Sequence, residues 1–526
     1  MSDNQYCDVH IETTLPKPWE QEESFNDVLY NWMSRAPWLL ISGALHFVIF
    51  LIVAAIPWSM FVEDKDTRIK TQLDVPPEEP FEEPPEEEIE EIEEEENEEE
   101  PIVEDYEVSD HSETNTNEVY ESSEGDPDMN ADSPFDNKAF NDVLGIGGGA
   151  GGKYGGRMGG NKNLRAANGL GTEQALKDGL EWLKNHQDED GKWDCDEFMK
   201  HDPPADRASR PLEDAGEANH DVGVTGLALL AFLGDGNTMR VGPYKDNVSR
   251  AMKWLREQQE AETGLIGDQI GHAFLYDHGI ATLAVCEAYY FDKSPLLKGT
   301  AQKAINFVTR ARNPYGAWRY DVPPIGDNDT SVTGWMVFAL KSAEEGGLKI
   351  DPEAFNGAKQ WFNEVSDAGT GRCGYDSPGS LSSRVPGRNE QYPAEKGEAM
   401  TSVALLCRFF LGEDPDKTPI MKAHAELMMK CLPKWEPDAK ANDMYYWYYG
   451  SYAMYQMGGR YWEQWNKAMK DAVLKSQRQQ PGSTTYHGSW DPVGPWGWSG
   501  GRVYSTALGV LCLEVYFRYG RVLGAR

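Results

Sequence analysis

Cysteine and basic residues are both scarce in this chain. Seven cysteines are scattered over 526 residues, which is too few and too dispersed for a disulfide framework. Lysine and arginine together number 49 against 88 aspartates and glutamates, and the net charge is −39. Contact with phosphate groups requires clustered Lys and Arg, so this composition argues against nucleic-acid binding.

The acidity belongs to one segment. Residues 71–137 contain 29 Asp or Glu and no Lys or Arg, so the rest of the chain carries only about −10. The run PPEEPFEEPPEEE (76–88) combines prolines that exclude helix with like charges that repel. We therefore expect residues 63–144 to form a disordered acidic Pro/Glu-rich linker. The glycine-dense residues 145–170 are expected to form a flexible joint.

A second absence lies nearer the start of the chain, where residues 38–62 contain no charged side chain. About 20 apolar residues are enough to cross a bilayer. The pattern predicts a single transmembrane helix at residues 37–62, preceded by a flexible polar tail at residues 1–36. The chain is then anchored in a membrane.

The sequence gives two opposed signals for the topology of this anchor. Lys65, Arg68 and Lys70 come directly after the apolar stretch, and the positive-inside rule would keep the folded domain in the cytoplasm. A long, self-repelling stalk is instead typical of a domain held away from its membrane across a periplasm-like space. We predict an inner-membrane protein whose folded domain lies on the periplasmic side.

Ser42 and His46 share one face of the predicted membrane helix, ahead of the Pro/Glu-rich spacer. This arrangement resembles the anchor of TonB-type energy transducers. The resemblance implies a proton-channel complex as a partner. The alternative is that Ser42 bonds to its own helix and that His46 is neutral near the interface. An ionisable residue at membrane depth is nevertheless a functional hypothesis.

Residues 171–526 repeat one unit, seen most clearly at residues 304–340. An amphipathic helix is followed by a turn with Gly316 and Trp318, and then by an almost wholly apolar helix after Asp329. Related second helices start near residues 220, 276, 328, 396, 448 and 503. Helices that are apolar on every face must be buried on all sides. Six buried helices alternating with six half-exposed ones predict an all-α fold, an (α/α)6 toroid of six helix pairs.

The turn pattern of the first unit is Gln187-x-x-x-Gly191-x-Trp193. It resembles the QW repeats of squalene–hopene cyclases and other triterpene cyclases, and the two-helix period is similar to that of protein prenyltransferase β-subunits. The resemblance covers the whole folded region. It implies an α/α toroid with a central cavity, but fold membership alone does not imply catalysis.

The chemistry of those families depends on residues that this chain lacks. The cyclases protonate their substrate with an Asp-x-Asp-Asp-Thr motif, and the matching stretch here is Gly-Asp-Asn-Asp-Thr (326–330). Asn328 therefore stands in the proton-donor position, and an amide cannot supply that proton. The prenyltransferases place zinc on Asp-x-Cys, where this chain has Ser331, a poor zinc ligand. We expect no metal and no cofactor.

Acidic residues recur at the starts of the predicted inner helices. Asp221, Asp277 and Asp329 occupy one column of the aligned repeats, where an Asp would cap its helix. Inner-helix starts also face one end of a toroid, so these carboxylates could ring a single mouth together with His220. His278 beside Asp277 could form an acid–base pair or half of a metal site, although a histidine satisfied by neighbours is the alternative. The candidate catalytic residues are Asp327, Asp329, Asp277 and His278.

Aromatic residues concentrate in the fifth unit, at residues 445–449. Their ring faces could hold a cation, a sugar or a lipid tail, although packing between helices is the simpler role. The candidate ligand-binding residues are His220, Asp221, Tyr445, Trp447, Tyr449 and Trp335. Together these features predict a membrane-anchored, terpenoid-cyclase-like toroid that binds or scaffolds a hydrophobic or glycan ligand. The alternative is an enzyme of that superfamily with a non-standard acid–base set.

Overall fold

The computed structural model describes residue 47 and residues 170–208, 211, 214–314, 316–436 and 440–518. The chain divides into two units, Met1–Ser112 and Glu113–Arg526. In the first unit the structure describes Phe47, which is helical and exposed. The predicted membrane span and acidic linker otherwise lie outside the described residues, as does nearly all of the glycine-rich joint. Among the helices that are described, none combines the length and the apolar character needed to cross a bilayer.

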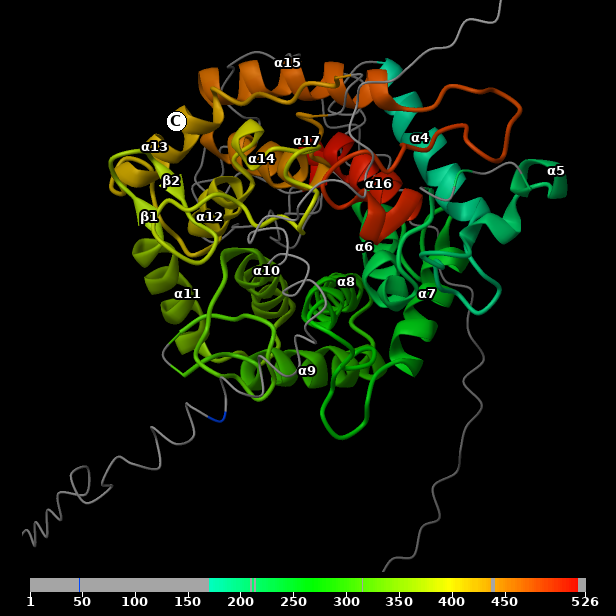
Figure 1. Ribbon diagram of the computed structural model, residues 1–526. Coiled ribbons are helices and arrows are strands. Elements are labelled where there is room, and N and C mark those ends of the chain that lie inside the picture. The colour runs from blue at the N-terminus through cyan, green and yellow to red at the C-terminus, as the bar shows by residue number, and fades with distance from the viewer. Residues whose placement is uncertain are drawn as a thin grey trace, which may run out of the picture. The chain divides into compact units, whose positions relative to one another are not determined.

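The second unit is built around a closed ring of helices (Figure 1). Each of these inner helices packs on the next, and the last packs back on the first. They are α6 (Asp221–Gly234), α8 (Phe274–Asp292), α10 (Thr330–Gly346), α12 (Ala399–Phe410), α14 (Met444–Met457) and α16 (Gly497–Leu513). Nearly every side chain of α6 is buried, as its almost wholly apolar sequence requires.

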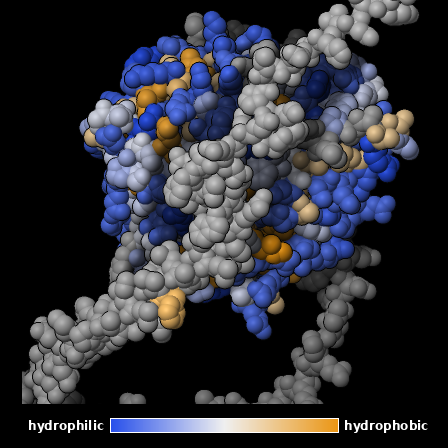
Figure 2. Space-filling view, in the orientation of Figure 1, coloured by the Kyte–Doolittle hydropathy of each residue, from blue (hydrophilic) through white to orange (hydrophobic). Residues whose placement is uncertain are grey.

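A second set of helices wraps the ring. Each packs on the inner helix that precedes it in the chain, except the first, α4, which packs on the last inner helix, α16. They are α4 (Leu170–Asn185), α7 (Lys245–Glu257), α9 (Pro295–Arg310), α11 (Pro352–Glu364), α13 (Pro419–Met428) and α15 (Gly459–Ser476). These outer helices bury one stripe and expose charged residues on the other side, which leaves a largely hydrophilic surface (Figure 2). The predicted all-α toroid is confirmed for the described residues.

Short elements occupy the connections between these helices. They are η2 (Phe198–His201), α5 (Pro204–Arg207), η4 (Ala218–His220), the antiparallel pair β1 (Ser366–Asp367) and β2 (Arg372–Cys373), η5 (Ala394–Lys396) and the terminal α17 (Val515–Arg518).

In three repeats a tryptophan in the turn ties the outer helix to the inner helix that follows it. The indole N–H of Trp193 donates to Leu183 O at 2.7 Å, and its backbone amide donates to the Thr225 hydroxyl on α6 at 2.9 Å. Trp318 makes the same two bonds, to Val308 O and Thr333, and Trp490 makes them to Val473 O and Thr506. The motif thus holds the repeat together.

The glutamine of the motif joins one repeat to the next. The Gln187 amide donates to Asn247 O on α7 at 3.0 Å. Gln477, in the last repeat, makes the equivalent bond to Ala175 O on α4, the first outer helix, at 2.7 Å. The toroid is therefore closed by the same contact that links its internal neighbours.

Adjacent inner helices run parallel, because each outer helix carries the chain back. Gly223, near the start of α6, faces Asp277 near the start of α8, and Gly279 faces Trp335 near the start of α10. All inner helices therefore begin at one end of the ring, here named the start end, and finish at the opposite end, the finish end.

Large aromatic side chains pack between the inner helices. Trp335 stacks on Tyr448 with the ring centroids 5.9 Å apart, and Phe338 packs edge-on against Phe410 and Tyr449. These residues are buried. The family resemblance implied a central cavity, and among the described residues aromatic side chains of α10, α12 and α14 pack against one another on one side of the ring.

Candidate functional site

The most distinctive group at the start end is the carboxyl of Asp329, which is completely buried at the beginning of α10. Its Oδ1 accepts the backbone N–H of Val332 at 2.8 Å, so Asp329 is an N-cap, as predicted for this column. The Tyr375 hydroxyl donates to Oδ2 at 3.5 Å. Burial raises the pKa of Asp329 to about 7, although the Val332 amide and the Arg319 charge partly oppose the shift. This carboxyl therefore changes charge near neutral pH.

A series of tyrosine hydroxyls leads from Asp329 towards the surface. The hydroxyls of Tyr375 and Tyr320 are hydrogen-bonded to each other, and the Tyr320 ring lies 6.2 Å from that of Tyr276. The Arg319 guanidinium lies over the rings of both Tyr320 and Tyr375. Burial raises the pKa of both of these tyrosines, so they remain protonated donors. Tyr320 and Tyr276 are half-buried and can be reached from outside.

The predicted aromatic candidates divide into two groups. Tyr445 belongs to the site, because its hydroxyl bonds the Ser331 hydroxyl at 2.9 Å two residues after Asp329. Trp335, Trp447 and Tyr449 are buried side chains of the inner helices. In this structure Trp335 and Tyr449 pack on neighbouring rings, and a ligand contact at these three residues stays a prediction.

Asp277 pairs with a different histidine from the one that the sequence suggested. His220 Nδ1 lies 3.0 Å from the Asp277 carboxylate, and its Nε2 lies 3.4 Å from Glu217. Burial alone would lower the pKa of His220, but the hydrogen bond and charge of Asp277 outweigh it and raise the pKa. The start end thus holds a His220–Asp277 pair at the junction of α6 and α8.

The prediction of an Asp277–His278 pair is wrong, because His278 is completely buried and serves the repeat. Its Nδ1 accepts the Ile266 amide at 3.0 Å and its Nε2 lies 3.3 Å from Ala304 O. Burial lowers the pKa of His278 to about 3, so the ring is neutral. In the first repeat the Thr225 hydroxyl accepts the equivalent turn amide, that of Trp193. The residue of α8 aligned with Thr225 is Ala281, which cannot accept it, and His278 does so instead.

Asp221 is held by its own turn and caps nothing. Its carboxylate accepts the Lys192 ammonium at 2.6 Å and the Cys195 amide at 2.8 Å. Oxygens of Asp221, Asp194 and Asp196 lie within 4.8 Å of one another, a spacing that could hold a cation. Lys192 also binds Asp194, however, so an ammonium group already neutralises this cluster. The shared column of aspartates therefore has three different roles.

The residues at the cyclase acid positions are structural or exposed. The Asn328 amide oxygen accepts the Ala317 amide at 2.8 Å and the Asn313 side chain at 2.9 Å, so it closes the turn. Asp327 is 64% exposed and lies 3.7 Å from Arg319. Among these described residues no acid occupies the donor position of the cyclases.

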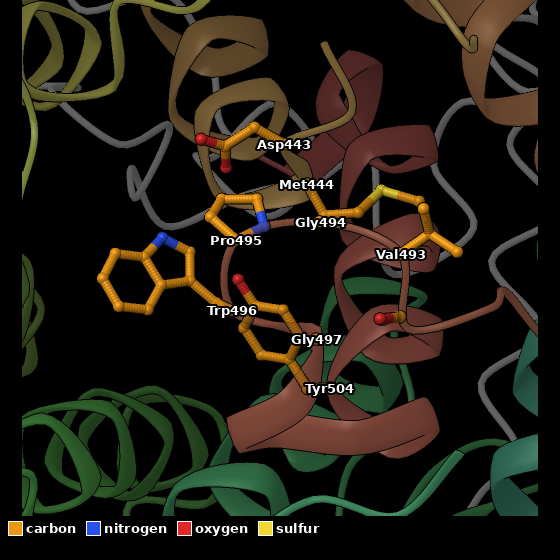
Figure 3. A pocket seen from close by; sticks show the side chains of 9 residues that line it. Asp443, Met444, Val493, Gly494, Pro495, Trp496, Gly497 and Tyr504 are labelled. Atoms are coloured by element: carbon orange, nitrogen blue, oxygen red, sulfur yellow. The ribbon is translucent and has the colours of Figure 1, made fainter. Parts of the chain in front are cut away.

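Sequence reasoning missed a second part of the start end, beside the first turn of α14. Asp443 caps α14 through the Tyr446 amide and pairs with Arg384 at 3.3 Å. A small pocket opens there between Asp443, Trp496 and Tyr504 (Figure 3). The pocket has room for about one water. The sequence signal that could have identified this part of the start end is Asp443, which stands just before the aromatic run of the fifth unit.

No family model matches this chain, and no curated protein matches it. Three solved structures illustrate what it is similar to. Unsaturated glucuronyl hydrolase from Bacillus sp. GL1 is 14% identical over 66% of this chain and 96% of its own, with a TM-score of 0.44. Cellobiose 2-epimerase from Bacillus thermoamylovorans is 13% identical over 64% and 95%, with a TM-score of 0.42. A type II terpene cyclase from Scytonema is 13% identical over 66% and 97%, with a TM-score of 0.40. Because the sequence identities and TM-scores are this low, no property of those proteins is transferred to this chain.

Proposed function

We propose that this chain is a membrane-anchored glycan-binding module whose toroid binds its ligand at the start end. The observation that carries the proposal is the division between the aromatic side chains packed among α10, α12 and α14 and a start end rich in carboxyl and hydroxyl groups. A bulky hydrophobic ligand inside the ring would have to displace Trp335, Phe338 and Tyr448, which are buried against one another.

The groups at the start end suit a hydroxyl-rich ligand. Carboxylates accept hydrogen bonds from sugar hydroxyls, and tyrosine hydroxyls both donate and accept. The aromatic bodies of Tyr320, Tyr276 and Trp496 are half-buried and offer apolar faces beside these polar groups. Such a mixture of a few oriented polar groups and aromatic surface is typical of small-ligand sites.

The proposal includes the anchor predicted at residues 37–62, with the toroid on the periplasmic side and Ser42 and His46 meeting a TonB-type proton-channel complex. A phosphatase active only outside the cytoplasm, fused after Arg526, tests the topology. We expect phosphatase activity from this fusion and no fluorescence from the matching cytoplasm-only reporter. The reverse pattern would place the toroid in the cytoplasm and remove the basis for the coupling.

The binding proposal is tested with the full-length protein in nanodiscs. The protein is applied to an array of immobilised neutral and acidic oligosaccharides, and in parallel its binding to squalene, a hydrophobic probe, is measured. We expect retention on oligosaccharides and none on squalene. Binding to squalene without binding to any oligosaccharide would replace the glycan with a hydrophobic ligand.

A second candidate, acid–base catalysis on the bound ligand, is favoured by one observation. The Asp329 carboxyl has a pKa of about 7 and contacts the Tyr375 hydroxyl, so it could give or take a proton near neutral pH. Mass spectrometry of an oligosaccharide that the protein retains, after incubation with wild type and with Asp329→Asn, separates the two functions. A product formed only by wild type would establish the enzyme.

A further inference from the structure

A surface loop crosses the second part of the start end. Residues 381–391, here named the strap, connect β2 to the start of α12, and none of them is buried. Hydrogen bonds and ring contacts link the strap to the fifth and sixth repeats through Arg384 and Arg388 alone, among the described residues. Arg388 lies over Trp498, with its guanidinium carbon 5.5 Å from the ring centroid. The strap is thus attached by very few contacts.

Arg384 is the buried exception in this exposed loop, with only 6% of its side chain accessible. Its guanidinium donates to Asp443 Oδ2 at 3.3 Å and lies over the Trp496 ring, 5.9 Å from the centroid. The remaining donors bond to Ser383 O and Tyr392 O within the same loop. The side chain therefore reaches from the strap to two of the residues that line the small pocket at α14, Asp443 and Trp496.

The two partners of Arg384 are those that a sugar ring would use. A carboxylate oxygen accepts hydrogen bonds, and an indole face packs against a flat apolar surface. The Tyr504 hydroxyl points into the same space, next to Pro495 and Asp443 (Figure 3). With Arg384 in place, the pocket has room for about one water. Without Arg384, the carboxylate and the indole face would both be open.

We propose that Trp496, Asp443 and Tyr504 form a sugar subsite that Arg384 occupies in the closed state, so that the strap must lift before a sugar ring enters. Arg384 acts as an internal competitor for the ligand. The inference rests on the proposed glycan-binding function and adds to it a second subsite, separate from the Asp329 group, and a means of regulating access. Removing the guanidinium should open the strap and strengthen binding.

The opening of the strap is measured without any ligand. Glutamyl endopeptidase cleavage after Glu390, followed by mass spectrometry, compares full-length wild type with Arg384→Ala and Arg384→Gln. We expect cleavage at least about tenfold faster in Arg384→Ala, because local opening determines the rate. Ethylguanidinium, which can refill the vacated place, should slow it again. Arg460→Ala on α15 is the matched control and should cleave like wild type. Equal cleavage rates in wild type and both Arg384 variants would overturn the proposal that Arg384 holds the strap closed.

The subsite is measured on the oligosaccharide array with the same proteins. Arg384→Ala should bind at least one oligosaccharide about tenfold more tightly than wild type, since the competing side chain is gone. Fast cleavage with unchanged or weaker binding would overturn the subsite and leave Arg384 with a structural role. If no variant binds any oligosaccharide, the glycan-binding function fails and the subsite with it. The cleavage rates then still decide whether Arg384 holds the strap. Thermal melting of both Arg384 variants shows that they are folded.

Discussion

The Asp329 carboxyl at the start end and the Arg518 cluster at the finish end are buried alike, but their charges are matched differently. At the finish end, the Arg518 guanidinium bonds to Glu287 and Glu514 at 2.9 Å each, and all three side chains are completely buried. At the start end, Asp329 is buried to the same degree. Its hydrogen-bond partners are an amide and a tyrosine, and within the described residues it forms no ion pair. Matched charge holds the ring closed, whereas unmatched charge costs stability and marks a place where function is expected.

The largest expected effect comes from breaking the match at the finish end. Arg518→Leu removes the guanidinium that bonds to the buried carboxylates of Glu287 and Glu514, so we expect the free energy of unfolding to fall by about 3–5 kcal/mol. Urea unfolding followed by circular dichroism measures it. Lys475→Ala, which removes an exposed i,i+4 pair with Asp471, should change stability by less than about 1 kcal/mol. Similar small losses in both variants would show that the Arg518 cluster is not what holds this end.

The next effect concerns the unmatched carboxyl and its dependence on pH. The folded state raises the pKa of Asp329 to about 7, so it binds a proton more tightly than the unfolded chain does. Its contribution is fully present below the unfolded pKa and is lost as pH rises through about 7. Asp329→Asn mimics the protonated form at every pH. Relative to wild type, the variant should therefore gain about 2–4 kcal/mol between pH 4.5 and pH 8.

Denaturant unfolding of wild type and Asp329→Asn at these two pH values gives the difference directly. A stability difference that does not change with pH would mean that Asp329 titrates normally. The start end would then carry no unmatched buried charge, and the contrast with the finish end would disappear.

A smaller effect separates closure of the ring from the matching of charge. Gly488 and Gly482 both have positive φ, at 85° and 90°, so alanine strains the backbone at either position. A Cβ at Gly488 would lie 2.2 Å from Asp178 O on the first outer helix, whereas nothing lies within 4 Å at Gly482. Gly488→Ala should be less stable than Gly482→Ala by about 1–3 kcal/mol in urea unfolding. Equal losses of stability in the two variants would show that the turn at Gly488 does not contribute to closing the ring.

The smallest expected effect is none at all. Incubation with squalene or oxidosqualene should yield no polycyclic product, because Asn328 occupies the donor position and aromatic side chains pack among α10, α12 and α14. Gas chromatography with mass spectrometry against a protein-free control measures it. A polycyclic product above that control would show that the protein catalyses cyclisation.

The repeat and the ring could be predicted from the sequence because they depend on local periodicity. Apolar helices of constant character alternate with amphipathic ones, and the recurring Gly and Trp fix the turn between them. Because the apolar helices must be buried on all sides, they are expected to form an inner ring. These features need no knowledge of which residues meet across repeats.

The site could be predicted only in part, because its residues are paired by loops of unequal length. Asp221, Asp277 and Asp329 share one column but meet a lysine, a histidine and a tyrosine, which come from two different connections. His278 accepts the turn amide that a threonine accepts in the first repeat, because the residue of α8 aligned with that threonine is Ala281. Arg384 was missed because an aperiodic loop carries it across to α14. Contacts of this kind appear only once the chain is folded.

The central claim is that ligand binds at the start end and not at the finish end. The most direct measurement compares two single variants on the oligosaccharide array, in full-length protein. Tyr320→Ala removes a half-buried ring and hydroxyl beside Asp329, and Lys341→Ala changes the other end of α10. The account predicts at least about tenfold weaker binding for Tyr320→Ala, as for loss of a central contact, and wild-type binding for Lys341→Ala. Wild-type binding by Tyr320→Ala together with loss of binding by Lys341→Ala would contradict it.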